Sequence, residues 1–150
     1  MMRFTMVLGL VVLAVALGCA RPQLFTPATD VEHVMRTRVD PAANLVWASV
    51  VTTVTVDGVR EKFPNTAEEW SALRNAASDL AESGNLLIKE NRATGNGDWG
   101  RQSQSLVAAA AATLKAVEAR SPDQILAAGE QIYNTCVGCH GGYSAMIPPR

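Results

Sequence analysis

The sequence predicts an all-α protein, an antiparallel bundle of four helices. Apolar residues recur at spacings of three and four in four separate segments, which is the period of an amphipathic helix. Several of these segments open with residues that cap a helix N-terminus, and mostly short connections separate them. Short connections make successive helices antiparallel neighbours, so the four apolar faces are expected to share one core.

The beginning of the chain has the features of an export signal. An apolar run covers residues 4–17, which is shorter than the ~20 residues that a membrane-spanning helix needs. It leads into an Ala-Leu-Gly-Cys sequence that resembles the lipidation signal of bacterial lipoproteins and ends at Cys19. Residues 1–18 are therefore interpreted as a lipoprotein-type signal peptide, Cys19 as the lipidated residue, and residues 19–28 as a tether. Ordinary signal cleavage nearby, which leaves Cys19 lost or as a free thiol, is the alternative.

The first helix is expected to begin at Thr29, because Thr29 and Glu32 fit a capping box. Asp40-Pro41 interrupts its apolar pattern, and a proline inside a helix removes a hydrogen bond and crowds the preceding turn. We expect a kink there, or a break at which Asp40 caps a second piece that runs through Val50. The apolar positions of this segment are Val31, Val34, Met35, Val39 and Ala42.

Residues 50–56 are rich in β-branched side chains, and Asp57-Gly58 then indicates a turn. Because no convincing second strand follows, these residues are predicted to form an extended connector or a frayed helix end.

The second and third helices have clear apolar stripes. The second is expected to begin at Thr66, where Thr66 and Glu69 fit another capping box, and residues 91–97 read as a loop before the third helix at about 98–120. The stripe of the second helix is Trp70, Leu73, Ala77, Leu80, Gly84 and Leu87, and that of the third is Leu106, Ala110, Thr113 and Val117.

The fourth helix starts with Ser121 at the N-cap and Pro122 at the first helical position, and Gln124 completes a capping box. Gly141-Gly142 is expected to end it. Its apolar face consists of Ile125, Gly129, Ile132, Cys136, Cys139, His140 and Tyr143.

This last face carries Cys-Val-Gly-Cys-His at residues 136–140, the attachment motif of a c-type haem. Cys136 and Cys139 can form thioether bonds with the two vinyl groups of one haem, and His140 can then bind the iron from the same side. This attachment is completed outside the cytoplasm, which agrees with the export signal and predicts a periplasmic, membrane-anchored lipoprotein. A dithiol redox pair, or a zinc site at the same three residues, is the alternative.

A helical bundle with this motif on its last helix resembles the cytochrome c-prime superfamily, the class II c-type cytochromes. The chain looks like the low-spin branch, in which a methionine of the first helix also binds the iron. Ser144 departs from the family pattern, which often has Arg or Lys after the tyrosine of the haem helix. The residues that carry the resemblance are Met35, Val39-Asp40-Pro41-Ala42, Trp47, Glu69-Trp70, Leu80-Ala81-Glu82, Asn85-Leu86-Leu87, Cys136, Cys139, His140 and Tyr143.

The second axial ligand of the iron is the open question. Met35 lies at helical spacing from Val31 and Val39, which places it on the apolar face. A buried methionine is often simple core packing, but the resemblance implies that Met35 is the ligand. His33 points about 200° away from Met35, toward the polar side. Met146 would reach the iron only if the chain wrapped around the haem edge. Arg36 and Arg38 are candidate partners for the haem propionates, or simply part of a solvated face.

Ligation by Met35 and His140 favours one-electron transfer by a monohaem c-type cytochrome of the bacterial cell envelope. Its partners would be redox proteins of the periplasm or membrane, and pairs of bundles are frequent in this family, so a homodimer is an option. We find no acid/base pair and no nucleophile–base arrangement near the motif, so the chain is not expected to be an enzyme. The sequence has a net charge of −1 and no basic tract, so nucleic acid is not an expected partner. A five-coordinate, gas-binding cytochrome c-prime-like protein, or an accessory lipoprotein stabilised by its haem, are the rivals.

Overall fold

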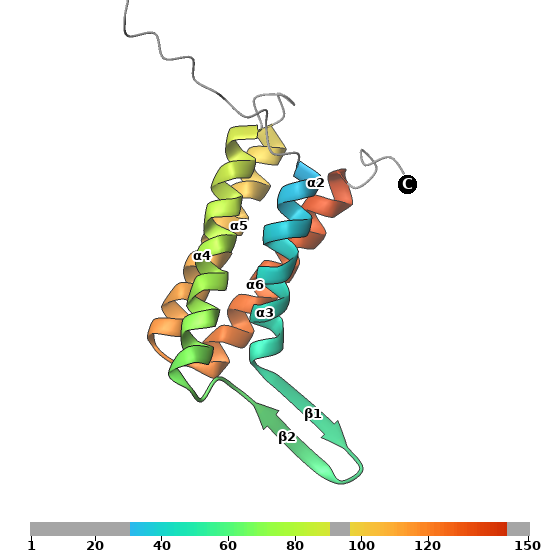
Figure 1. The fold of residues 1–150 in the computed structure, drawn as a ribbon. Coiled ribbons are helices and arrows are strands. Elements are labelled where there is room, and N and C mark those ends of the chain that lie inside the picture. Colours follow the sequence, from blue (N-terminus) through green and yellow to red (C-terminus); the bar gives the residue numbers. More distant parts are fainter. Residues whose placement is uncertain (1–30, 91–96, 144–150) are drawn as a thin grey trace, which may run out of the picture.

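Four helical rods packed in sequence order, with one β-hairpin, make up the part of the chain that the computed structural model describes, residues 31–90 and 97–143 (Figure 1). Contacts between successive rods are joined by contacts between α3 and α6, which close the bundle. The direction of the chain alternates from rod to rod in Figure 1. The first rod comprises α2 (Val31–Val34), η1 (Met35–Val39) and α3 (Asp40–Ser49), and the others are α4 (Ala67–Glu90), α5 (Gly97–Glu118) and α6 (Pro122–Tyr143).

The predicted helical bundle is thus confirmed, and the predicted apolar stripes form its core, except that at the end of the last helix Cys139 is half-buried and His140 is exposed. Leu73, Leu80 and Ile132 are 0% exposed. Burying a leucine or isoleucine side chain contributes about 1.5–3 kcal/mol, so these positions hold the rods together. Thr29, the predicted tether, Cys19 and Met146 lie outside the described residues. Among residues 31–90 and 97–143, no helix is both long and apolar enough to span a membrane.

The predicted capping box at Thr66 is confirmed, whereas at Ser121 only the N-cap bond forms and the Ser121 amide donates instead to the Ala116 carbonyl at 3.1 Å. At the start of α4, the Glu69 amide donates to the Thr66 hydroxyl at 3.2 Å, and the Glu69 carboxylate accepts from the amides of Thr66 (3.2 Å) and Asn65 (2.8 Å). At the start of α6, the Gln124 amide donates to Ser121 Oγ at 3.4 Å, and Pro122 is the first helical residue. The glycine pair predicted to end α6 lies instead within its last turn.

The predicted irregularity at Asp40-Pro41 is present, but it is not a break. The first rod continues through a π-helical turn, η1, in which the Asp40 amide donates to the carbonyl of Met35, five residues earlier. Asp40 itself has α-helical backbone angles, and no side chain caps the start of α3, so the expectation that Asp40 caps a second helix is wrong. The wider turn relieves the clash between the Pro41 ring and the preceding turn.

The expectation of a connector without a partner strand is also wrong. Strand β1 (Val51–Thr55) pairs antiparallel with β2 (Gly58–Lys62), with Thr55 opposite Gly58 at the turn. Gly58 has φ +128°, which favours glycine. Every residue of both strands is exposed, so no alternation of buried and exposed positions marks them in the sequence.

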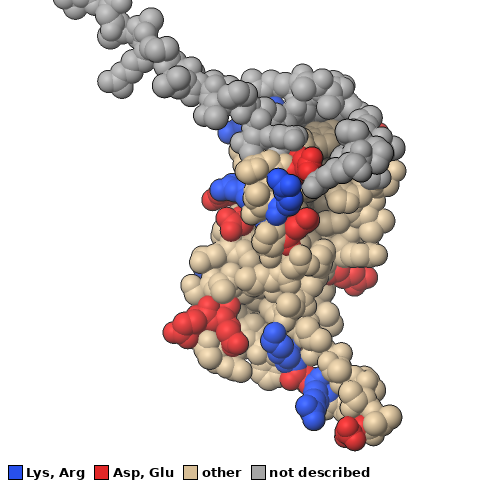
Figure 2. Space-filling view, turned by 45° about the vertical axis from the view of Figure 1, so that its right-hand side comes forward, with Lys and Arg blue, Asp and Glu red and all other residues tan. Residues whose placement is uncertain are grey.

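The bundle has two distinct ends in Figure 1. At one end, called here the cysteine end, α2 begins, α4 finishes, α5 begins and the last turns of α6 lie. At the opposite end, the hairpin end, β1 and β2 project away from the helices. On the face shown in Figure 2, acidic and basic side chains are interspersed, with broad uncharged areas between them.

Candidate functional site

A small cavity of about 40 Å³ at the cysteine end brings together residues from all four rods. Met35 reaches it from the first rod, and Cys136, Cys139 and His140 reach it from α6. Every predicted haem ligand that the structure describes therefore lines one cavity. The remaining wall is contributed by Val39, Asp40, Leu87, Gln102, Ser103, Leu106 and Thr135.

Helix α6 holds the three motif residues on one face. Residues three and four positions apart are neighbours on a helix surface, so Cys136 lies beside both Cys139 and His140. Both cysteines are half-buried free thiols, whereas His140 is exposed. The two thiols are thus available on the same face as the adjacent imidazole.

The environment of the two thiols keeps them protonated at neutral pH. Burial raises the pKa of Cys136, and the neighbouring Cys139 and the Asp40 carboxylate raise it further. Burial also raises the pKa of Cys139. Thiol–disulfide exchange requires a thiolate, and redox dithiols have lowered pKa values. These surroundings are therefore unlike those of a dithiol redox centre.

Met35 lies on the π turn and lines the same cavity as the α6 residues. Its side chain is partly buried against the hydrophobic core. His33 is exposed and does not line the cavity; its carbonyl accepts a hydrogen bond from Thr37 Oγ1 at 2.7 Å. Of the two candidate axial ligands in the first rod, the structure brings only Met35 to the cysteines.

Trp99 and Tyr143 support this end of the bundle. The Trp99 indole donates from Nε1 to the carbonyl of Leu87 at 2.7 Å, and the Tyr143 ring packs edge-on against it, with ring centroids 5.1 Å apart. The Tyr143 hydroxyl is buried and, within the described residues, has no hydrogen-bond partner. An unpaired buried hydroxyl normally costs free energy, so it indicates a polar group that remains to be supplied.

Gln102 is a site residue that the sequence did not single out. Its side-chain Oε1 and Nε2 lie 3.1 and 3.2 Å from the position that a Cβ atom on Gly138 would occupy. The side-chain amide of Gln102, which belongs to α5, thus contacts α6 at Gly138, between the two cysteines. The one sequence signal was its spacing of four from Leu106, which places both residues on the same face of α5.

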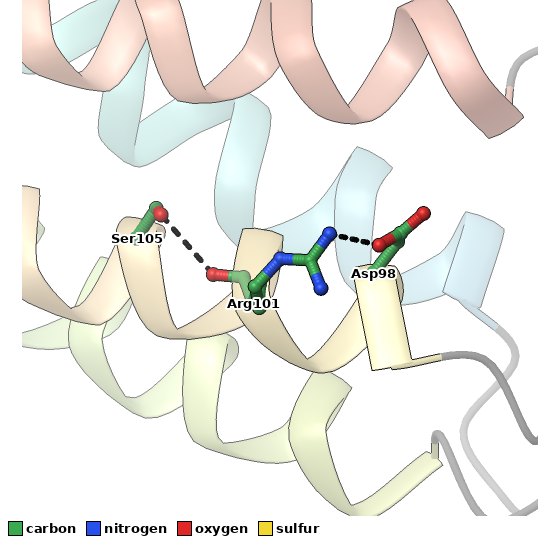
Figure 3. Close-up of polar contacts among 3 residues, drawn as sticks. All are labelled: Asp98, Arg101 and Ser105. Atoms are coloured by element: carbon green, nitrogen blue, oxygen red, sulfur yellow. Dashed lines mark hydrogen bonds and ion pairs between the residues drawn. The ribbon is translucent and has the colours of Figure 1, made fainter.

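Arginines near this end already have acidic partners. Arg36 pairs with Glu32 and Arg38 with Glu82, each at 3.9 Å, on the exposed surface. Arg101 pairs with Asp98 in the first turns of α5, and Ser105 Oγ donates to the Arg101 carbonyl at 3.1 Å (Figure 3). The solvated-face interpretation of Arg36 and Arg38 therefore describes them best.

The donor set fits a c-type haem in its chemistry. Two thiols and an imidazole share one helix face, a thioether lines the same cavity, and an unpaired phenol lies one turn beyond His140. The cavity itself is much smaller than the roughly 300–1,000 Å³ of small-molecule sites. A porphyrin would therefore require the Gln102 amide and neighbouring side chains to withdraw. For a zinc site, no three His, Cys, Asp or Glu side chains in residues 31–90 and 97–143 converge on one point.

A larger groove of about 300 Å³ lies between α3 and α6, toward the hairpin end, away from these donors. There the Trp47 indole donates to the Gly129 carbonyl at 2.9 Å, and a Cβ atom on Gly129 would lie 3.3 Å from Trp47 Cδ1. The absence of a side chain at Gly129 thus lets Trp47 pack closely against α6.

Comparison with known proteins adds no assignment, because no family model, curated protein or solved structure matches the chain.

Proposed function

We propose that the chain is a monohaem c-type cytochrome that transfers single electrons, built as an antiparallel four-helix bundle with haem c on its last helix. Cys136 and Cys139 would carry the thioether bonds, and His140 and Met35 would be the axial ligands. The observation that carries the proposal is the single cavity that Met35 shares with both cysteines and His140. Those residues are about a hundred positions apart in the sequence.

The haem iron would supply the redox chemistry by cycling between its ferrous and ferric states. The protein would contribute two ligands to the iron, the His140 imidazole and the Met35 thioether. A thioether opposite an imidazole favours low-spin iron and raises its reduction potential, which suits electron transfer. The apolar side chains of Val39, Leu87 and Leu106 would exclude water from the iron, and the Tyr143 hydroxyl could donate a hydrogen bond to a propionate.

The cellular setting is part of the proposal. The signal at residues 1–18 and Cys19 would deliver a lipid-anchored protein to the periplasmic side of a membrane, where haem attachment is completed. Its partners would be redox proteins of the periplasm or membrane. The interspersed surface charges of Figure 2 support protein partners more than a polyanion such as nucleic acid.

Two measurements on the exported, haem-loaded protein test this function. Mass spectrometry after denaturation should find one haem retained on the chain, and the Cys136→Ala/Cys139→Ala double variant should lose it. The spectrum of the reduced protein should show sharp low-spin bands. A chain without retained haem would contradict the assignment of the cofactor.

Matched variants then identify the axial ligands. Met35→Ala should convert the spectrum to a high-spin form that binds carbon monoxide rapidly, whereas Met146→Ala should leave it unchanged. His140→Ala should alter the proximal ligation, and His33→Ala should not. A wild-type protein that is already high-spin and binds carbon monoxide rapidly would instead identify a gas-binding protein.

A further inference from the structure

The π turn η1 begins at Met35, a predicted iron ligand, and ends shortly before Pro41. The turn spans Met35–Val39, and Pro41 follows two residues later. In an α-helix each amide donates to the carbonyl four residues earlier, whereas here the Asp40 amide donates to Met35, five residues earlier. π turns of this kind are often found at functional sites.

Pro41 accounts for the position of this turn. Its nitrogen has no hydrogen to donate, and in a regular helix its ring would clash with the carbonyl of Thr37, four residues earlier. An extra residue in the preceding turn moves that carbonyl away from the ring. Pro41 therefore disfavours the regular α-helical register for the residues just before it.

The turn also decides which side chains face the bundle. Val34 and Val39 are 1% and 4% exposed. Five residues of regular α-helix would separate their directions by about 140°. Because the π turn accommodates one more residue, both valines face the core, and Met35 lines the same cavity as Cys136 and His140.

We infer that Pro41 is the positioning residue for the sixth iron ligand: it holds the π turn that directs Met35 toward the haem iron. This inference rests on the proposed function. Loss of the turn would restore the bond from the Asp40 amide to Arg36 and rotate the segment that contains Met35 by about 100° relative to α3. The thioether would then leave the iron, although the methionine itself is unchanged.

Pro41→Ala in the haem-loaded protein tests the inference. An alanine restores the missing amide and has a high helix propensity, so the bundle should stay folded with haem retained. The reduced protein should lose low-spin character and the ring-current-shifted Met35 methyl resonance. If the ligand-free fraction rises from about one per cent to about half, the apparent affinity for carbon monoxide should rise about fiftyfold.

Pro122→Ala is the matched control. Pro122 occupies the first position of α6, where an amide has no intrahelical acceptor, so its replacement should leave the spectrum and carbon monoxide affinity unchanged. A crystal structure of Pro41→Ala gives a readout independent of redox chemistry. In it the Asp40 amide should donate to the Arg36 carbonyl rather than to the Met35 carbonyl.

The outcomes separate this inference from the proposed function. A low-spin wild type that becomes high-spin in both Met35→Ala and Pro41→Ala supports both. A low-spin wild type whose spectrum survives Pro41→Ala, with the π turn retained, overturns the role of Pro41 alone and assigns the turn to the packing of Val34 and Val39. A high-spin wild type overturns both.

Discussion

Two tryptophan–tyrosine pairs, one at the cysteine end and one toward the hairpin end, repeat the same chemistry in different surroundings. Each indole donates a hydrogen bond to a helix carbonyl, and each ring meets a tyrosine of α6 edge-on. Trp99 bonds to Leu87 at 2.7 Å and packs against Tyr143, whereas Trp47 bonds to Gly129 at 2.9 Å and packs against Tyr133.

The two bonds differ in their surroundings. Leu87 lies in the last described turn of α4, and the bond that its carbonyl accepts from the Trp99 indole is buried. Gly129 lies inside α6, where its carbonyl already accepts a hydrogen bond from the amide four residues later. The bond from the Trp47 indole is therefore a second one. Trp99 is also 8% exposed, against 37% for Trp47. The comparison indicates that position and burial, more than residue type, decide what each pair contributes.

The largest expected effect comes from truncating the buried indole. Trp99→Ala should lower the free energy of unfolding by about 3–5 kcal/mol, because it leaves a cavity and removes the support of Tyr143. Trp47→Ala should lower the free energy of unfolding by clearly less, because the Trp47 side chain is already partly exposed to water. Urea denaturation of both variants measures the difference, and equal losses would contradict the comparison.

Removing only the hydrogen bond isolates the role of the acceptor. Trp99→Phe should lower the free energy of unfolding by about 1–1.5 kcal/mol, because it removes a buried hydrogen bond. Trp47→Phe should cost about 0.5–1 kcal/mol, because the Gly129 carbonyl keeps its helical bond. The difference between the two equilibrium unfolding curves is the test, and a larger loss at Trp47 would reverse the order proposed.

The two tyrosines should respond differently from their tryptophans, because only Tyr143 has a buried hydroxyl. Tyr143→Phe removes a buried hydroxyl that has no partner in the described residues. The free energy of unfolding of the haem-free protein should therefore rise by up to about 1 kcal/mol. Tyr133 is exposed, and Tyr133→Phe should change stability by less than about 0.5 kcal/mol. Thermal unfolding of the haem-free variants measures both, and a marked destabilisation by Tyr143→Phe would show that the hydroxyl is already bonded.

The smallest effect concerns pH and belongs to the hairpin end. Hydrogen bonds from the amides of Asn65 and Thr66 lower the pKa of Glu69. Its lowered pKa means that this stabilisation is complete above the ordinary glutamate pKa and is lost as pH falls through the lower folded value. Glu69→Gln should remove this part of the acid dependence, whereas Glu68→Gln on the same exposed turn should retain it. Unfolding curves recorded at a series of acidic pH values compare the two variants.

Features that depend on neighbours in sequence were predictable. The N-caps at Thr66 and Ser121 form as expected, because a hydroxyl and an amide three residues apart meet at a helix N-terminus. The irregularity near Pro41 was predictable for the same reason, since the missing amide is a local property. Its form as a π turn was not, because a kink, a break and a wider turn all satisfy the proline.

Features that depend on other elements were missed. The hairpin has no buried face, so its second strand carries no periodic signal, and its pairing follows from the turn at Gly58. Gln102 became a site residue because α5 packs against α6 at Gly138. The Trp99 bond to Leu87 likewise required α4 and α5 to pack together. None of these partners could be chosen from helical spacing alone.

The sequence by itself determined where α4 and α6 begin, most of the buried faces of the helices, and that Cys136, Cys139 and His140 share one face of the last helix. These are consequences of local hydrogen bonding and of a fixed helical period. Only the tertiary structure decided that Met35 lines the same cavity and that a π turn precedes Pro41. The physical reason is that a helix fixes directions around its own axis, whereas the rotation of one helix against another is set by packing across the core.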